Sequence, residues 1–344
     1  MITLPPRATA SHPYPRAPKY PNWRGALEDA VTSPTELCQL LGLPPSLVVS
    51  SGGLVEMAPL LVPRTYLARI QRGNPKDPLL LQVLPREEEL AEQPGFTKDP
   101  LGEAGATRGP GLLGKYPSRL LIVATRRCAV HCRFCFRRHF PCAAAPRSQG
   151  DWDEILRRIR SEPSVREVVL SGGDPLCLED SFLAELAQRL AAIDHVHRLR
   201  IHTRLPIVIP QRVNDELIAW LRGTRLVPIF AVHVNHPAEI DNAVAAAFGQ
   251  LVEAGIPVLS QSVLLRGVND RVDVLAELFE RLVDLRVMPY YLHQLDRVFG
   301  ASHFEVPEVR GIELVRQLRA RLPGYAIPRY VREAPGAPNK WVLA

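Results

Sequence analysis

From Tyr116 onward, short apolar runs rich in β-branched residues alternate with longer amphipathic stretches. Stretches such as WDEILRRIRSE and DSFLAELAQRLAAI have the spacing of apolar residues that is typical of helices. Strands and helices that alternate in this way predict βαβ units and a parallel sheet. The apolar runs that we interpret as strands span residues 119–124, 166–171, 198–203, 227–234, 257–264 and 287–292.

Six strand–helix units are fewer than the eight that close a TIM barrel. We therefore predict an α/β fold built on a partial (β/α)6 TIM-like barrel. Barrels of this kind gather their chemistry at the C-terminal ends of the strands. The loops that follow the predicted strands are the places where functional residues are expected.

The chain before the barrel has a different character. Residues 1–22 are polar and rich in proline, which predicts an extended arm. The stretches NWRGALEDAV and SPTELCQLLGL then have helical spacing, and Ser33 before Pro34 fits an N-cap followed by proline at the first helical position. A third helix is expected near residues 66–72. Residues 74–113 are rich in proline, glycine and acids, and we interpret them as a long loop.

The end of the chain, YVREAPGAPNKWVLA, has neither a helical nor a strand pattern and is interpreted as a loop. The predicted organisation is an N-terminal arm and helical region at 1–113, a barrel at 114–300 and a C-terminal segment at 301–344.

Composition limits the class of protein. The chain has 344 residues, of which 46% are hydrophobic, so it can bury a large core. No apolar run approaches the roughly 20 residues that span a bilayer, and the first residues lack the apolar core of a secretory signal. We expect a cytoplasmic protein without a membrane partner. The net charge of +6 would suit nucleic acid, but the arginines are dispersed, so anionic ligands or an acidic protein partner are expected instead.

The stretch CAVHCRFC sets Cys128, Cys132 and Cys135 in a C-x3-C-x2-C array. Thiolates are soft ligands that favour iron–sulfur clusters, zinc or copper(I). Three thiolates on a four-iron cluster leave one iron open to a small chelating molecule. The alternatives are a zinc site completed by His131 or His139, or buried thiols without a metal. Zinc sites usually pair two C-x2-C knuckles, and no second knuckle occurs, so the cluster is favoured.

The remaining cysteines, Cys38, Cys142 and Cys177, lie far from one another in the sequence and are interpreted as ordinary cysteines. After the second predicted strand comes SGGDPL, which contains Gly172, Gly173 and Asp174. Paired glycines let a backbone approach a ligand closely, and the Asp-Pro pair suits a tight turn.

The cysteine array resembles that of the radical S-adenosylmethionine (SAM) superfamily, in which the open iron of a [4Fe-4S] cluster binds SAM. In that family a glycine-rich motif one strand later contacts SAM, and SGGDPL resembles it, which implies that Gly172, Gly173 and Asp174 bind SAM. The same resemblance implies a partial barrel.

From about Tyr116 to the end, the chain resembles the lysine 2,3-aminomutase family, and its short branch in particular, which supplies β-lysine for elongation factor P. This resemblance implies an isomerase that uses the cluster, SAM and pyridoxal phosphate (PLP) to convert L-lysine to β-lysine, the R isomer being favoured. Its partners would be an electron donor, elongation factor P and a lysyl ligase. The motifs that carry the resemblance are YPSRLL, CRFCFRRHF, SGGDPL, RIHTRLPIVIPQR, HVNHP, QSVLLRGVND, YYLHQLD and EAPGAPNK.

The resemblance also implies roles for substrate-binding residues. Arg137 would pair with the α-carboxylate of lysine, which suits a bidentate guanidinium. Asp296 and Glu333 match the two acids that bind the ε-ammonium. Arg138 is interpreted as a solvated side chain. Taken alone, each acid would more often be a surface residue.

Cofactor-binding residues follow in the same way. Lys340 matches the lysine that binds PLP, although a lysine near a terminus is usually just solvated. Tyr116 and Arg119 would contact PLP, and His233 and Gln261 would lie near SAM. For these four, core packing or a structural hydrogen bond is the alternative.

The sequence departs from the longer aminomutases in three ways. The glycine run before their PLP lysine is GAPN here, one of their two lysine-binding aspartates is Glu333, and their C-terminal extension and zinc-binding cysteines are missing. These departures favour the short branch. Two alternatives stay open: an aminomutase for another amino acid, such as glutamate or arginine, and a zinc-stapled RNA-binding module.

Overall fold

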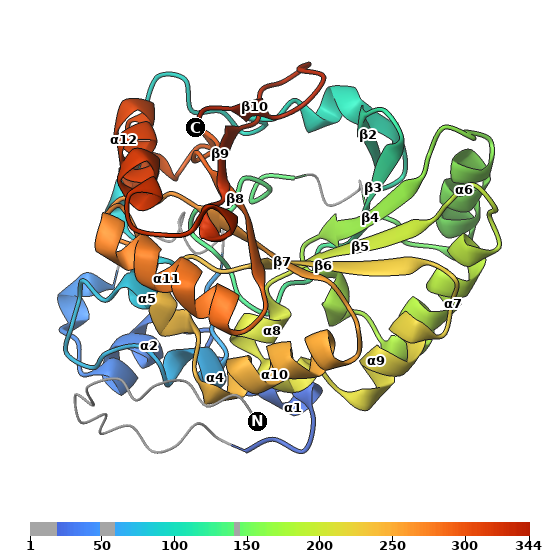
Figure 1. The fold of residues 1–344 in the computed structure, drawn as a ribbon. Coiled ribbons are helices and arrows are strands. Elements are labelled where there is room, and N and C mark those ends of the chain that lie inside the picture. Colours follow the sequence, from blue (N-terminus) through green and yellow to red (C-terminus); the bar gives the residue numbers. More distant parts are fainter. Residues whose placement is uncertain (1–18, 49–58, 141–144) are drawn as a thin grey trace.

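The computed structural model describes residues 19–48, 59–140 and 145–344. Most of the predicted N-terminal arm and Cys142 therefore lie outside the described residues. A ten-stranded sheet runs in sequence order from β1 to β10 (Figure 1). Its strands are β1 (Thr107–Gly109), β2 (Leu112–Tyr116), β3 (Arg119–Thr125), β4 (Glu167–Gly172), β5 (Arg198–Thr203), β6 (Val227–His233), β7 (Val258–Val263), β8 (Met288–His293), β9 (Arg329–Arg332) and β10 (Trp341–Val342).

The centre of the sheet is parallel, from β3 through β9. β3 to β8 are the six predicted strands, so that prediction is confirmed. β1, β2 and β10 pair antiparallel to their neighbours at the two ends of the sheet. Within the described ranges no ladder joins β1 to β10, and the curved sheet stays open as a partial barrel (Figure 1).

Helices cover the outer face of the sheet (Figure 1). Leu170, Ile201 and Phe230 are register partners on three adjacent strands and form one apolar row under the helices. Each of the three is at most 1% exposed. The covering helices are α6 (Gln149–Arg160), α7 (Asp180–Ala191), α8 (Leu205–Val208), α9 (Asp215–Arg222), α10 (Asn242–Glu253), α11 (Val272–Asp284) and α12 (Glu308–Arg319).

In the described residues before the sheet, the short α-helices are α1 (Trp23–Glu28), α2 (Pro34–Leu41), α4 (Arg64–Leu67) and α5 (Pro78–Leu81). The predicted N-cap of α2 is confirmed, because the Ser33 side chain accepts the Glu36 N–H at 3.3 Å. The third predicted helix is smaller than expected and consists of the single turn α4. Apolar residues of this region belong to the same hydrophobic core as those of the barrel.

Two predicted loops are wrong in part. The segment 74–113 contains α5, capped by the Asp77 side chain, two short 3-10 helices, β1 and the start of β2. Its prolines and acids act as helix caps and first-turn residues, which the composition does not distinguish from a loop. The C-terminal segment also contains β9 and β10, and the loop between them carries Lys340.

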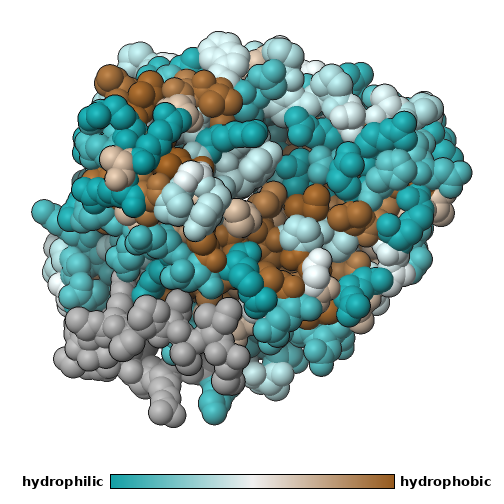
Figure 2. Space-filling model, viewed as in Figure 1, coloured by the Kyte–Doolittle hydropathy of each residue, from teal (hydrophilic) through white to brown (hydrophobic). Residues whose placement is uncertain are grey.

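The surface shown in Figure 2 is mostly polar, with apolar residues in separate patches. Val309 and Ile312 of α12 are among the exposed apolar side chains. In the part of the chain that the structure describes, no helix combines the length and apolarity that crossing a membrane requires.

Candidate active site

The three cysteines of the array lie in the loop after β3, at the C-terminal end of the sheet. The N-terminal region holds this loop from one side. The backbone N–H of His131 donates to the Leu61 carbonyl at 3.1 Å, and that of Arg133 donates to the Gln82 carbonyl at 2.9 Å. The helical region therefore forms one wall of the cysteine loop.

A buried ion triad reinforces this contact. Arg133 donates to both carboxylate oxygens of Glu89 at 2.8 and 2.6 Å, and Arg138 donates to Glu89 at 2.7 Å. Burial opposes ionisation of Glu89, but the two arginines outweigh it and lower its pKa. The interpretation of Arg138 as a solvated side chain is wrong, since only 2% of that side chain is exposed.

The paired glycines after β4 support the loop from the other side. Gly173 donates its N–H to the Thr125 carbonyl at 2.7 Å. A Cβ on Gly172 would lie 2.4 Å from that same carbonyl oxygen, and one on Gly173 would lie 2.3 Å from the Arg127 carbonyl. Glycine is therefore required for the close approach of β4 to the backbone that leads into the cysteines. SAM binding by these glycines stays a prediction.

Asp174 is buried and joins the ends of two strands. Its carboxylate accepts hydrogen bonds from the Thr203 hydroxyl at 2.8 Å and from the backbone N–H of Arg204 at 2.7 Å. Its own N–H donates to the Arg127 carbonyl at 2.7 Å. The turn predicted from SGGDPL thus links β4, β5 and the cysteine loop.

The chemistry of the three thiols fits an iron–sulfur cluster. Burial and then neighbouring Cys135 raise the pKa of Cys128, and burial and then Cys132 raise that of Cys135 to about 11. The three sulfurs are therefore within electrostatic reach of one another. The thiols of Cys128 and Cys135 therefore stay protonated at neutral pH until metal binding displaces the protons.

The two histidines that could complete a zinc site each have one ring nitrogen in contact with a backbone carbonyl. The His131 ring nitrogen Nδ1 contacts the Pro59 carbonyl at 2.6 Å, and His139 Nε2 contacts the Phe299 carbonyl at 3.2 Å. Among residues 19–48, 59–140 and 145–344, no three His, Cys, Asp or Glu side chains are grouped closely enough for one metal ion.

Of the SAM residues predicted on β6 and β7, His233 contacts the cysteine loop. His233 and Gln261 are register partners on β6 and β7. The His233 ring stacks on Phe134, with ring centroids 5.4 Å apart, and Phe134 lies between two of the cysteines in sequence. Burial lowers the pKa of His233 to about 3, so its imidazole is neutral.

A second group of charged residues fills the barrel interior. Arg137 forms a bidentate pair with Glu103, with distances of 2.8 Å for Nε–Oε2 and 2.7 Å for Nη2–Oε1, and it also donates to the Ser171 hydroxyl. The Lys115 ammonium lies 3.0 Å from Glu333 and 3.7 Å from Glu103. Neither Glu103 nor Lys115 is predicted as a site residue from the sequence, and the one available signal is that Lys115 directly precedes the YPSRLL motif.

Lys340 pairs with Glu333 in this interior. Burial opposes ionisation of Glu333, but Lys340 and Lys115 lower its pKa to about 2. The pKa of Asp296 moves the other way, to about 7, because of burial and the nearby Glu333 charge. The structure therefore brings together Lys340, Glu333 and Asp296, with one acid fully ionised and the other only half ionised at neutral pH.

Two neutral imidazoles face the same lysine. Along β5 and β8 the side chains alternate between the outer helices and the interior, and His202 and His293 take interior positions. Burial and then a nearby cation lower both pKa values, that of His293 to about 3. Lys340 is a cation near each of them. The two imidazoles beside Lys340 are therefore neutral at neutral pH.

Tyr116 and Arg119 could hold an anionic cofactor. The Arg119 guanidinium lies over the Tyr116 ring, 4.7 Å from its centroid. In the described part of the chain, the buried Nε atoms of Arg119 and Arg200 have no hydrogen-bond partner. Guanidinium groups with an unused buried donor atom suit a phosphate, so these residues fit the phosphate of PLP.

Known proteins match most of the chain. The family model described as "Radical SAM superfamily" matches residues 122–279. A protein named L-lysine 2,3-aminomutase from Haemophilus influenzae is 42% identical over 323 residues, which is 94% of this chain and 96% of that protein. One of the same name from Escherichia coli is 42% identical over 327 residues, covering 95% of each chain. A third, from Clostridium subterminale, is 36% identical over 321 residues, which is 93% of this chain and 77% of that protein.

Proposed function

Because the chain belongs to the L-lysine 2,3-aminomutase family of radical SAM isomerases, we propose that it moves the α-amino group of L-lysine to Cβ and uses PLP held by Lys340. Cys128, Cys132 and Cys135 hold the [4Fe-4S] cluster. The cluster and SAM supply a radical that removes a hydrogen atom, and PLP supplies a conjugated system for the migrating nitrogen.

The observation that carries the choice of lysine is the Lys340–Glu333 pair with Asp296 nearby. Glu333 already contacts two ammonium groups, those of Lys340 and Lys115, in a largely buried position. When Lys340 holds PLP, its ammonium charge is withdrawn from Glu333. Glu333 keeps Lys115 as a partner, and the position that Lys340 leaves beside Glu333 and Asp296 would then be open to the ε-ammonium of a substrate.

At the other end of the substrate, Arg137 binds the α-carboxylate through its bidentate fork. The interior charges oppose an acidic side chain at the Glu333 end, which makes a glutamate aminomutase the weaker candidate. Arg119 and Tyr116 hold the phosphate and ring of PLP. His233 and Gln261, together with the Gly172–Asp174 turn, line the SAM side.

The physiological role that we propose is to supply (R)-β-lysine to a separate ligase that modifies elongation factor P. Its support is the short-branch pattern of the motifs, with GAPN before Lys340 and a glutamate, Glu333, as one of the two substrate-binding acids. We also propose a cytoplasmic location, because the chemistry needs reduced thiols and an electron donor.

The test is an anaerobic reaction of reconstituted protein with SAM, PLP, dithionite and L-lysine, followed by chiral separation of the products. Formation of (R)-β-lysine supports the whole proposal. SAM cleavage with unchanged lysine, and turnover of another amino acid from a panel, would overturn the substrate. A protein with a full cluster that does not cleave SAM would overturn the proposed chemistry.

A further inference from the structure

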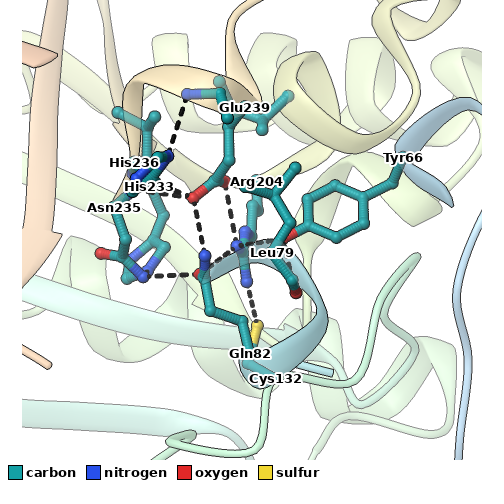
Figure 3. Close-up of polar contacts among 12 residues, drawn as sticks. Tyr66, Leu79, Gln82, Cys132, Arg204, His233, Asn235, His236 and Glu239 are labelled. Atoms are coloured by element: carbon teal, nitrogen blue, oxygen red, sulfur yellow. Dashed lines mark hydrogen bonds and ion pairs between the residues drawn. The ribbon is translucent and has the colours of Figure 1, made fainter. Parts of the chain in front are cut away.

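Arg204 lies directly after β5 and was not assigned a role by any motif. Its guanidinium Nη1 donates to the sulfur of Cys132 at 2.8 Å (Figure 3). The side chain is 6% exposed. A buried cation therefore contacts one of the three sulfurs that hold the cluster.

The guanidinium is fixed from several directions. Its Nη2 donates to Gln82 at 2.6 Å and to Glu239 at 2.9 Å, and Figure 3 shows these groups converging on it. Its backbone N–H is held by Asp174. Because each of these partners is buried, the direction of Nη1 toward the sulfur is set by the fold.

Gln82 connects this contact to the N-terminal region. It follows α5 and is 0% exposed. Its amide nitrogen donates to Glu239 at 3.1 Å, its amide oxygen also accepts from Asn235, and its backbone carbonyl accepts from Arg133 in the cysteine loop. One residue of the helical region thus touches the cysteine loop directly and also positions Arg204.

We propose that Arg204 is a positioning residue that orients Cys132 and raises the reduction potential of the [4Fe-4S] cluster, with Gln82 holding it in place. This inference rests on the cluster assignment made above, and it does not depend on lysine as the substrate. In the step concerned, the 2+ cluster takes up one electron from an external one-electron donor and becomes the 1+ cluster.

The physical reason is the charge that reduction adds. A donor to a ligand sulfur stabilises the more negative, reduced cluster more than the oxidised one, and hydrogen bonds to the sulfurs are a recognised determinant of cluster potential. Burial strengthens the effect because little water screens the charge. Glu239 pairs with the other nitrogen, Nη2, so Nη1 stays directed at the sulfur.

A simple salt bridge is the competing explanation. In that case Arg204 would only balance the buried Glu239, and its contact with Cys132 would have no effect on the cluster. The chain contains a matched control for this explanation. Arg212 is 0% exposed and pairs with Asp180 at 2.8 Å, and its nitrogens have no described contact with the three cysteines.

The experiment compares Arg204→Met/Glu239→Gln with Arg212→Met/Asp180→Asn, so that each double variant removes a buried ion pair without leaving a lone charge. Iron and sulfide analysis establishes the cluster content. An EPR-monitored redox titration without SAM, PLP or lysine then gives the midpoint potential. At a fixed potential, the ratio of reduced to oxidised cluster should fall about tenfold in the Arg204 variant, or about 59 mV for one electron, and stay unchanged in the control.

An unchanged potential in the Arg204 double variant would overturn the proposal, as would an equal shift in both double variants. If the Arg204 double variant takes up no cluster, the midpoint potential is measured in the single variants Arg204→Lys and Gln82→Met instead. Both of these variants keep the buried charges. A potential shifted negatively in these variants supports the proposal, and a wild-type potential in both overturns it. If the variants give this shift but the wild-type protein makes no β-lysine, the proposed substrate is wrong and the proposed role of Arg204 still holds.

Discussion

Arg137 and Glu103 meet in a bidentate ion pair inside the barrel, with nitrogen–oxygen distances of 2.8 and 2.7 Å. Both side chains are nearly buried, at 9% and 5% exposure. The fork that the proposed function assigns to the substrate carboxylate is thus occupied by a carboxylate of the chain itself. Substrate binding then requires that Glu103 withdraw from, or share, the Arg137 guanidinium.

The first prediction concerns this competition. In Glu103→Gln the neutral amide competes less well than a carboxylate with the substrate for Arg137. The KM for L-lysine should therefore fall about tenfold, which corresponds to ~1.4 kcal/mol of binding free energy, while kcat changes little. Steady-state kinetics with saturating SAM and PLP measures both constants. The exposed Glu92→Gln is the control and should behave as wild type. A rise in KM would instead show that Glu103 holds Arg137 in its productive orientation.

The second prediction distinguishes the two lysines that contact Glu333. Borohydride reduction of the PLP-loaded protein should attach PLP to the wild type and to Lys115→Gln, but only to background level in Lys340→Ala. The reason is that a covalent link to PLP requires the lysine amine, whereas Lys115 acts as a charge. Mass spectrometry of the reduced protein locates the attachment. Full labelling of Lys340→Ala would disprove the PLP assignment.

The features that could be predicted are those that depend on residues close together in the sequence. The six central strands were found because each is a run of apolar, β-branched residues about six long, and the cysteine array was found because its members lie within eight positions. β9 and β10 were missed because four and two residues are too few to show alternation. β9 pairs with β8, which is distant in sequence, and β10 pairs in turn with β9.

The charged partners could not be predicted in this way. Arg138 was interpreted as solvated, yet its partner Glu89 is 49 positions earlier in the chain. Glu103 lies 34 positions before Arg137. Neither Glu89 nor Glu103 belongs to a recognisable sequence motif. Each acid meets its arginine only when the segment 74–113 folds against the barrel.

The third prediction follows from the pKa of Asp296, which is about 7 because of burial and the Glu333 charge. Since this pKa lies above the ordinary value of about 4, the folded chain binds the proton more tightly than the unfolded chain, and Asp296 contributes less to stability as pH rises through about 4 to 7. In the protein without PLP, Asp296→Asn should therefore raise Tm by about 5 °C at pH 8 and by little at pH 5.

Differential scanning calorimetry at both pH values checks this expectation. Asp194→Asn replaces an exposed acid and should leave Tm unchanged at either pH. If Asp296→Asn lowers Tm more at pH 8 than at pH 5, the carboxylate is stabilised as an anion, and the direction of the shift is wrong.

The fourth prediction concerns Glu89, which joins the helical region to the cysteine loop. Glu89→Gln removes the charge that two buried guanidiniums share, so unfolding should become easier by about 3–5 kcal/mol. The loop should also lose its fixed position, and iron incorporation should fall well below that of the wild type. Denaturant titration and iron analysis measure the two effects. The neighbouring Glu88→Gln is the control, because the Glu88 side chain is 57% exposed. A stable Glu89→Gln protein with a full cluster would mean that the loop is positioned by its backbone contacts with Leu61 and Gln82 alone.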